Sequence, residues 1–441
     1  MTNFENGNSS NFSLTNWNWE KYVSISEAEI LNKSLAGKEI SIEEGLELFE
    51  IKGSGILALM KVADLLRERS SGDQVSYVIN RNINFTNVCI KRCGFCAFSR
   101  DHRLEQGYFL PLEEVLRRAK EAWELGAREV CIQAGLPPKM DGMLYVELTK
   151  ALKEELPDMH VHGFSPEEVL YGSIRSGLSI REYLIALKEA GVGSLPGTSA
   201  EILDDDVRDV IANGRITTDQ WKEVIKTAHQ VGIPTTSTIM YGHIENSLNK
   251  SQHIDSIRNI QKDTGGFTEF VPLSFIFEEA PMHSAQLIPG LRKGATGDEV
   301  IKMHAVARIM LNGYIKNIQV SWVKEGHKLG ELLLHAGAND LGGTLINESI
   351  STSAGASYGQ LTRPKELRAM IRDAGRIPVE RNTLYETIKE YAREEFVDES
   401  DSPLDTVSSE KFGSYNQLVA SSDFRFQENF IPGFSISKKD K

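Results

Sequence analysis

The chain has 441 residues, of which 40% are hydrophobic and 25% are charged, and its formal net charge is −13. This composition is ordinary for a globular protein in aqueous solution, and the negative charge argues against non-specific nucleic-acid binding. No apolar run approaches the roughly 20 residues of a membrane-spanning helix, and the polar N-terminus lacks a signal-peptide pattern. We therefore expect a cytoplasmic protein whose function involves neither nucleic acid nor a membrane.

The first part of the chain is predicted to precede the main fold. Residues 1–20 are rich in Asn and Ser and are expected to form a flexible tail. Within residues 21–76, three segments carry helical patterns, each opening with a serine and closing on a glycine, which are typical helix boundaries. We predict a small N-terminal helical layer.

Residues 77–380 alternate between strand-like and helix-like segments, which predicts an α/β fold, a (β/α)8 TIM-type barrel. In such barrels the functional groups gather at the C-terminal ends of the strands. An incomplete barrel is the alternative, because the fourth and eighth strand patterns are the weakest. The predicted strands are 77–85, 128–135, 160–164, 191–198, 234–242, 267–275, 315–322 and 336–343.

The last part of the chain, residues 381–441, is predicted to be a C-terminal extension. Residues 381–396 have a helical pattern, and the residues after them are polar and irregular. We expect one helix followed by a tail or a loosely docked segment.

Three of the four cysteines, Cys89, Cys93 and Cys96, fall within eight residues just after the first predicted strand. A 4Fe–4S cluster normally takes four thiolates, so the spacing C-x3-C-x2-C would leave one iron open. This spacing is typical of radical S-adenosylmethionine (SAM) enzymes, in which the open iron binds SAM. It predicts one 4Fe–4S cluster with three cysteine ligands, exchangeable SAM, and hydrogen-atom abstraction by a carbon radical. Phe95, between the last two cysteines, is expected beside the adenine of SAM.

A zinc site, with His102 as fourth ligand, is the alternative interpretation of these cysteines. Structural zinc sites usually show paired C-x2-C knuckles or histidines at ligand spacing, and the sequence has neither. The fourth cysteine, Cys131, lies in the second predicted strand, where a buried core cysteine is more usual than a ligand. Four cysteines in a chain of this length are not a disulfide framework, and a cluster needs a reducing compartment. The pattern favours the cluster.

Several segments resemble one family of radical SAM enzymes over roughly residues 75–385. They are NFTNVCIKRCGFCAFSR, HGFSPEEVLYG, LPGTSAEILDDDVR, TTSTIMYGHIE, TGGFTEFVPLSFI, NIQVSWVK and GANDLGGTLINESISTSAG. The family is that of the 5-amino-6-(D-ribitylamino)uracil–L-tyrosine 4-hydroxyphenyl transferases, the tyrosine-using subunits of FO synthase (CofH family). The chain departs from the family pattern at Ala134, where a glycine is expected, at Pro137-Pro138 and at Gly163.

The resemblance implies a transferase in the biosynthesis of the deazaflavin FO. It would join the 4-hydroxybenzyl group of L-tyrosine to C5 of 5-amino-6-(D-ribitylamino)uracil, releasing 2-iminoacetate, methionine and 5′-deoxyadenosine. The implied partners are these two substrates, the cyclising FO synthase subunit, and an electron donor such as ferredoxin or flavodoxin. A futalosine-pathway enzyme of menaquinone biosynthesis is the alternative within the same class.

The resemblance also implies SAM-binding residues near the cysteines. Gln133 and Gly135 are expected to meet the amino group of SAM, although Gly135 would equally suit a plain turn. Glu201 and Arg208 are seven residues apart, close to two helical turns, so we predict that they share one helix face and bind SAM. The alternatives are an acidic residue in the first turn of a helix for Glu201 and a solvent-facing side chain for Arg208.

Six further residues near the predicted strand ends are candidates for binding tyrosine or the uracil. A histidine at a barrel rim is often structural instead, and Asn or Asp before Leu-Gly-Gly favours a tight turn. The candidates are His162, Tyr241, His243, Glu245, Asn339 and Asp340.

Overall fold

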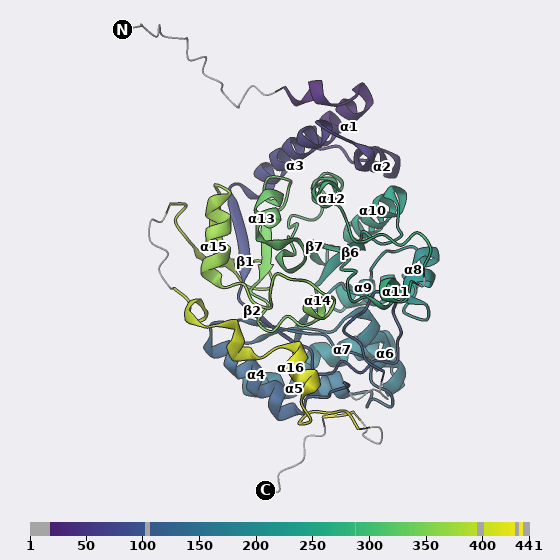
Figure 1. Cartoon of the computed structure of the whole chain (residues 1–441), viewed down its shortest axis with the longest axis vertical. Helices are drawn as coiled ribbons and strands as arrows, with labels where there is room; N and C mark the ends of the chain where they lie inside the picture. The colour runs from purple at the N-terminus through teal and green to yellow at the C-terminus, as the bar shows by residue number, and fades with distance from the viewer. Residues whose placement is uncertain (1–17, 102–105, 287, 395–400, 428–431, 435–441) are drawn as a thin grey trace.

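A set of parallel strands surrounded by helices forms the centre of the fold (Figure 1). It is seen in a computed structural model that describes residues 18–101, 106–286, 288–394, 401–427 and 432–434. The barrel strands are β1 (Gln74–Val78) with its continuation β2 (Asn80–Ile83), β3 (Glu129–Ile132), β4 (His160–His162), β5 (Val192–Ser194), β6 (Thr235–Tyr241), β7 (Phe267–Ser274) and β8 (Asp340–Gly343). Parallel pairing runs from β2 to β5, joins β6 to β7, and joins β8 to β1.

Single backbone bridges complete the ring where the strands are short. Leu195, just after β5, bridges Thr235 at the start of β6. Ile318 and Gln319 take the seventh strand position, with bridges to β7 on one side and β8 on the other. The predicted eight-stranded barrel is therefore confirmed, and the incomplete alternative is wrong. The strand predicted over 315–322 is shortened because helix α13 (Trp322–Leu333) begins inside that range.

Helices cover the outside of the ring and share one continuous apolar core with the strands (Figure 1). Several begin at a side chain that accepts a hydrogen bond from the first turn, as at Ser165, Thr217 and Asn246. Such caps satisfy N–H groups that have no partner within the helix. Besides α13, these helices are α4 (Leu112–Glu124), α5 (Leu144–Glu155), α6 (Pro166–Ser176), α7 (Ile180–Ala190), α8 (Asp205–Ala212), α9 (Thr218–Gln230), α10 (Ser247–Thr264), α11 (Pro281–Ser284), α12 (Gly297–Met310), α14 (Ile350–Ser353) and α15 (Pro364–Asp373).

The N-terminal segment forms helices where the sequence pattern predicts them, and residues 1–17 of the predicted tail lie outside the described part of the chain. The elements are η2 (Trp19–Tyr22), α1 (Ile25–Leu35), α2 (Ile42–Glu50) and α3 (Gly55–Ser71). Helix α3 packs on α12, and α2 packs on both α10 and α12. The close approach of α2 requires Gly45, because a Cβ there would lie 2.6 Å from the Met310 sulfur.

The helix predicted over residues 381–396 is wrong. β9 (Ile377–Arg381) pairs in parallel with β1, and β10 (Thr387–Glu390) returns antiparallel to β9. The partner of β9 is β1, which is far away in the sequence, so a local sequence pattern does not predict the pairing. All four residues of β10 are exposed, so no buried face marks this segment as a strand. Residues 395 and 396 lie outside the described part of the chain.

The described residues after 400 pack against the barrel rather than forming the loosely docked tail that we expected. They contain η3 (Pro403–Thr406), η4 (Ser409–Phe412) and α16 (Tyr415–Ala420). The buried Tyr415 hydroxyl donates to the Phe98 carbonyl at 2.9 Å and accepts from Asn87 Nδ2 at 3.2 Å. Asp405 forms a buried ion pair with Arg368 at 3.1 Å. These partners fix the segment to the cysteine loop and to α15.

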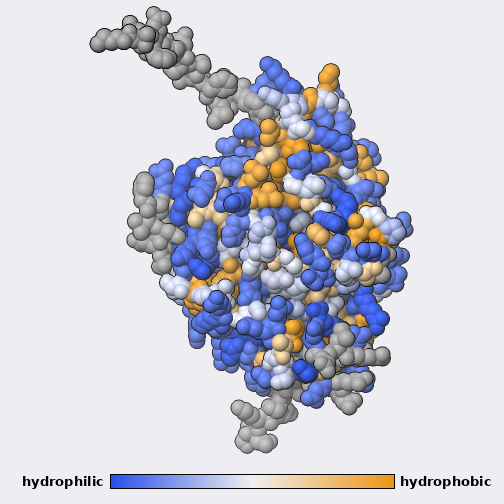
Figure 2. All heavy atoms as spheres, in the orientation of Figure 1, coloured by the Kyte–Doolittle hydropathy of each residue, from blue (hydrophilic) through white to orange (hydrophobic). Residues whose placement is uncertain are grey.

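The surface shown in Figure 2 is mostly hydrophilic, with hydrophobic side chains gathered over the N-terminal helices α1 and α3. Exposed apolar residues of this region include Ile25 and Leu57. None of the helices in the described ranges is both long enough and apolar enough to cross a bilayer.

Candidate active site

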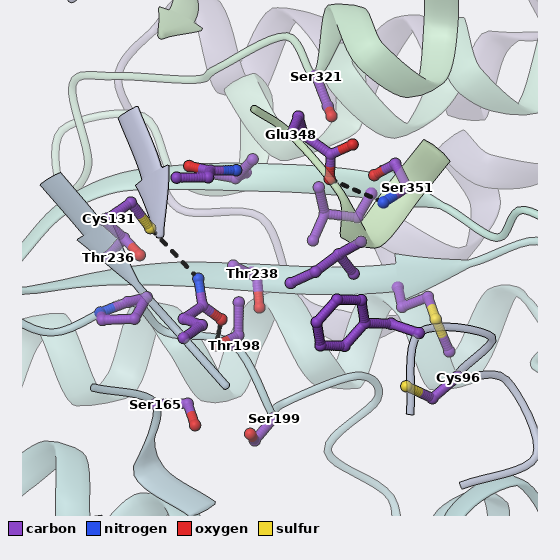
Figure 3. Close-up of a pocket in the computed structure, with 18 of the residues that line it drawn as sticks. Cys96, Cys131, Ser165, Thr198, Ser199, Thr236, Thr238, Ser321, Glu348 and Ser351 are labelled. Atoms are coloured by element: carbon purple, nitrogen blue, oxygen red, sulfur yellow. Dashed lines mark hydrogen bonds between the residues drawn. The ribbon is translucent and has the colours of Figure 1, made fainter. Parts of the chain in front are cut away.

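A cavity of about 390 Å³ occupies the interior of the barrel and opens at the C-terminal ends of the strands. In Figure 3, Ser165 and Ser199 lie on one wall of this cavity. Ser321 and Glu348 lie on the opposite wall, and Cys96 lies at one side. The chemistry-bearing residues thus lie where a (β/α)8 barrel normally places an active site.

The cysteine loop borders this cavity with all three motif residues, Cys89, Cys93 and Cys96. The loop is held by Gly94, whose N–H donates to the Ile211 carbonyl at 2.8 Å. A Cβ on Gly94 would lie 2.9 Å from the Met282 side chain, so the close approach of α11 requires glycine.

The three thiols fit a 4Fe–4S cluster with one open iron. All are free, and burial raises the pKa of Cys93 to about 12 although Arg215 opposes the rise, so binding to iron is what would ionise this thiol. No three His, Cys, Asp or Glu side chains in the described residues converge on a single-ion site. A cluster does not need such convergence, because each thiolate binds its own iron. His102, the fourth ligand of the zinc alternative, lies outside the described residues.

Gln133 and Gly135 follow β3 and border the cavity beside the cysteine loop. Gln133 Oε1 accepts from the Thr198 hydroxyl at 2.8 Å, and its Nε2 lies 3.4 Å from the Cys131 sulfur. A Cβ on Gly135 would lie only 2.3 Å from the Val88 carbonyl oxygen. Gly135 therefore lets the backbone before Cys89 approach the end of β3, which is a steric reason for glycine.

Ala134 contacts Glu168 through its backbone. Its N–H donates to Glu168 Oε1 at 2.9 Å, and the other oxygen of Glu168 accepts from the Ser165 N–H and hydroxyl at 2.8 and 2.6 Å. Burial raises the pKa of Glu168 to about 7. Because the contact uses the N–H, alanine serves as well as the expected glycine here.

The predicted pairing of Glu201 with Arg208 on one helix face is wrong. Glu201 has a φ of +46° and lies before α8, so no helix joins the two residues. The buried Arg208 guanidinium donates to backbone carbonyls and does not line the cavity. The four carbonyls belong to Ser199, Ala200, Ile202 and Ile216.

Arg215 is the arginine that faces the cavity in place of Arg208. It donates to the Glu201 carboxylate at 2.8 Å and to the Ser199 hydroxyl at 2.7 Å, and it pairs with Glu167 at 3.3 Å. Its guanidinium carbon lies 5.6 Å from the centre of the Phe95 ring. Phe95 lines the cavity together with the three cysteines.

His162 lines the cavity and belongs to a short hydrogen-bonded chain. Its Nδ1 and the Nε2 of His160 each lie 2.7 Å from the Ser194 hydroxyl oxygen. Burial lowers the pKa of His162, although the nearby Glu129 carboxylate opposes this shift. Both imidazoles are therefore held neutral around pH 7, since burial also lowers the pKa of His160 to about 4.

The inner end of the cavity is lined by acids and closed by the β9–β10 hairpin. Glu269 accepts from Gln319 Nε2 at 2.9 Å and from the Tyr385 hydroxyl. Burial raises the pKa of Glu269 to about 7, against the effect of Arg381. Arg381 is itself paired with Asp340 at 2.6 Å. The charge of Arg381 is thus already neutralised by a protein carboxylate.

Five of the six predicted substrate-binding residues do not line the cavity; His162 is the exception. On β6, Thr236, Thr238 and Met240 point inward, so the alternating residue Tyr241 points away from the cavity. His243 and Glu245 pair with each other at 3.2 Å and are completely buried.

Asn339 and Asp340 are occupied by structural partners. Asn339 accepts from Arg308 at 2.7 Å, and Asp340 holds Arg381. The sequence alternative for these two residues was a tight turn, but Asp340 is the first residue of strand β8, and both side chains bind buried arginines.

The sequence reasoning missed several cavity residues. Glu167 and Glu168 follow Ser165 in the first turn of α6, so the sequence pattern predicts a role at the helix N-terminus and nothing more. Arg215 lies in the connection between α8 and α9, which has no motif of its own. In the sequence, Glu269 and Lys324 are simply polar residues near the predicted strands. No pattern there predicts that their side chains point into the barrel.

Comparison with known proteins identifies the relatives of the chain. Residues 83–251 match the Radical SAM superfamily, and residues 264–394 match the CofH/MqnC C-terminal region. The chain is 51% identical to the 5-amino-6-(D-ribitylamino)uracil–L-tyrosine 4-hydroxyphenyl transferase of Methanothermobacter thermautotrophicus, covering 82% of this chain and 98% of that protein. It is 48% identical to the FO synthase of Streptomyces avermitilis, covering 78% of this chain but 39% of that longer protein.

Solved structures of similar fold include the hydrogenase maturase HydG, with a TM-score of 0.63 at 18% identity over 83% of this chain and 78% of HydG. Methylornithine synthase has a TM-score of 0.59 at 18% identity over 78% of this chain and 95% of that enzyme. The barrel, the cysteine loop and these matches define a radical SAM enzyme. Within that class the chain belongs to the family of 5-amino-6-(D-ribitylamino)uracil–L-tyrosine 4-hydroxyphenyl transferases.

Proposed function

We propose that this protein joins the 4-hydroxybenzyl group of L-tyrosine to C5 of 5-amino-6-(D-ribitylamino)uracil in the biosynthesis of FO. The observation that carries the proposal is one cavity inside the barrel with a three-cysteine loop at one side and hydrogen-bonding side chains at the other, in a chain about half identical to transferases of that name. Such a cavity would keep a reactive intermediate away from solvent and from competing hydrogen donors.

Cys89, Cys93 and Cys96 would hold the 4Fe–4S cluster, and SAM would bind beside them. When bound, the two cofactors supply a 5′-deoxyadenosyl radical that takes a hydrogen atom from the tyrosine amine. Phe95 would lie against the adenine, and Gln133 and Glu201 present side-chain oxygens to SAM. Gly135 would serve by steric fit, because it lets the cysteine loop lie close to β3.

Arg215 takes the role that the sequence had suggested for Arg208. Its guanidinium lies at the cavity wall between Glu201, Glu167 and Phe95. It would orient Glu201 and balance the negative charge on this side of SAM. A planar guanidinium suits such a role because it can donate several hydrogen bonds in fixed directions.

His162 would act at the substrate end of the cavity. Its Nδ1 is engaged by Ser194, which fixes the ring and leaves Nε2 toward the cavity. A neutral imidazole there can accept a proton from the tyrosine ammonium group, and the amine must be neutral before it loses a hydrogen atom. Tyr241, His243, Glu245, Asn339 and Asp340 would support the fold around the site rather than touch the substrates.

The protein partners of this reaction are also part of the proposal. A second hollow shares the three cysteines with the main cavity and is lined by Lys91, Arg92 and Arg100 together with Asp101 and Glu279, so basic side chains slightly outnumber acidic ones. An acidic electron carrier such as ferredoxin or flavodoxin would dock there, because local positive charge offsets the chain's net charge of −13. The product would pass to the cyclising FO synthase subunit.

The test is an anaerobic assay of the reconstituted protein with SAM, a reductant, L-tyrosine and the diaminouracil, followed by mass spectrometry. We expect the tyrosine-derived adduct together with 5′-deoxyadenosine and methionine. Turnover of a futalosine-pathway substrate, with none of the uracil adduct, would assign the chain to menaquinone biosynthesis instead.

A further inference from the structure

One cation of the cavity wall has no partner among the residues that the structure describes. Three other cations of the wall are paired: Lys91 with Glu167 at 3.2 Å, Arg215 with Glu201 at 2.8 Å, and Arg381 with Asp340 at 2.6 Å. Lys324 also lines the cavity. Within the described ranges, its ammonium group has neither an ion pair nor a hydrogen bond with another residue.

Lys324 lies in the first turn of α13, just after the seventh strand position. It follows Ser321, which Figure 3 places on the wall opposite Ser165 and Ser199. Of the SAM candidates, Glu201 lies two residues after Ser199, and Gln133 is hydrogen-bonded to the neighbouring Thr198, so both belong to the wall of Ser199. Lys324 therefore enters the cavity from the wall opposite those serines, while Glu201 across the cavity is still near enough to act on its charge.

The acids nearest to Lys324 are engaged elsewhere. Burial lowers its pKa, while Glu348, Glu325 and Glu201 raise it. Glu348 accepts from the N–H groups of Ser351 and Thr352 at 2.7 and 3.1 Å. These acids favour the charged form of the lysine from a distance. None of the described acids forms an ion pair with its ammonium group.

We propose that Lys324 binds the α-carboxylate of the tyrosine substrate. Lys324 is half-buried, and an ammonium group that is partly removed from water is costly until a hydrogen-bonded anion pairs with it; a carboxylate is the anion that an amino-acid substrate brings. The inner end of the cavity would repel that carboxylate, because Glu129 and Glu269 line it. The proposal rests on the proposed function.

The surroundings of Lys324 suit the rest of the tyrosine molecule. Val323, next to Lys324 in the chain, lines the same cavity as Leu345 and Ile350, and the three offer an apolar surface to the aromatic ring. The amine would then project toward SAM and His162. The inner end would remain for the uncharged, hydroxyl-rich ribitylaminouracil, whose donors suit the carboxyl groups of Glu129 and Glu269.

SAM also carries an α-amino-acid carboxylate, so the experiment must separate the two sources. We propose Lys324→Met, which keeps the length of the side chain and removes its charge. The matched control is Lys328→Met, an exposed lysine on the same helix. Binding of L-tyrosine, of tyramine (which lacks the carboxylate) and of SAM is measured on cluster-loaded proteins by titration.

We expect Lys324→Met to weaken tyrosine binding about 10- to 100-fold, the range for a charged hydrogen bond. Tyramine and SAM should bind the variant and the wild type equally, and Lys328→Met should change nothing. Weakened SAM binding would assign the lysine to methionine's carboxylate, and unchanged tyrosine binding would also overturn the proposal.

Two further measurements keep the test decisive. If Lys324→Met does not fold, the wild type alone must still prefer tyrosine to tyramine, and Lys324→Arg must retain that preference; equal binding of the two ligands would overturn the proposal. A wild-type protein that binds tyrosine but forms no uracil adduct would contradict the proposed function while leaving the carboxylate site in place.

Discussion

At the scale of single residues, Cys93 and Cys131 differ in what surrounds each sulfur. Both are free and border the same cavity, but Cys93 lies in the three-cysteine loop, whereas Cys131 lies on β3 beside Gln133. Burial raises the pKa of both thiols to about 12. Position relative to the other cysteines, and not thiol acidity, therefore distinguishes the two.

We predict that Cys93→Ala removes the brown absorbance of the reconstituted cluster and SAM cleavage while the barrel stays folded. Cys131→Ser is the matched control and should keep both, at a cost of about 1–2 kcal/mol in stability. Iron content, absorbance and 5′-deoxyadenosine formation are measured on the same samples. Wild-type SAM cleavage by Cys93→Ala would contradict the assignment.

Replacing Arg208 should affect stability, because its buried guanidinium donates to four backbone carbonyls at once. We predict that Arg208→Ala lowers the free energy of unfolding by at least about 3 kcal/mol, since each buried acceptor left unpaired is costly. The affinity of the folded fraction for SAM should change little. Urea denaturation and SAM titration on one preparation check both statements, and lost SAM affinity with unchanged stability would restore the original prediction.

At the scale of elements, the β9–β10 hairpin closes the inner end of the cavity. It joins the barrel through the pairing of β9 with β1 and supplies Arg381 and Thr383 to the cavity wall. The ion pair between Arg381 and Asp340 is almost completely buried, with side chains 4% and 0% exposed. Because the pair is buried, water cannot solvate the Arg381 charge if Asp340 is removed, so this contact anchors the hairpin.

We predict that Asp340→Asn destabilises the protein by about 3–5 kcal/mol, because it takes from the buried Arg381 charge its closest carboxylate and leaves the more distant Glu269, at 3.8 Å. The control on the same hairpin is Lys389→Met, which removes a half-exposed ion pair with Asp401. That loss should stay within about 1 kcal/mol. Chemical denaturation gives both values, and equal losses would show that the buried pair does not anchor the hairpin.

At the scale of the whole molecule, stability should depend on pH through the buried carboxyl of Glu269. Burial, reinforced by Asp340 and opposed by Arg381, raises its pKa from 4.5 to about 7. Between these values the folded protein binds more protons at this site than the unfolded chain, so rising pH reduces stability across the window. Above pH 7 the contribution becomes constant.

We predict that the unfolding free energy of the wild type, relative to Glu269→Gln, falls by about 3 kcal/mol between pH 4.5 and 7. Denaturation at a series of pH values measures the difference. For Glu114→Gln the pH dependence of relative stability should have the opposite sign, because Arg117 and Arg118 outweigh burial and lower the Glu114 pKa to about 2. There the wild type should gain relative stability as pH rises from 2 to 4.5. A pH-independent difference for Glu269→Gln would contradict the prediction.

The sequence by itself determined the class of enzyme and the barrel. Three cysteines within eight residues are a local feature, and the alternation of strands with capped helices is repeated along the chain, so neither depends on distant contacts. The tertiary structure decided which side chains enter the cavity. Tyr241 points away from the cavity because side chains alternate along β6. Arg208 binds backbone carbonyls, and Arg215 is the arginine that lines the cavity near Glu201. The C-terminal hairpin depends on the pairing of β9 with β1, which lies about 300 residues earlier in the chain. A local sequence pattern cannot predict a pairing between such distant segments.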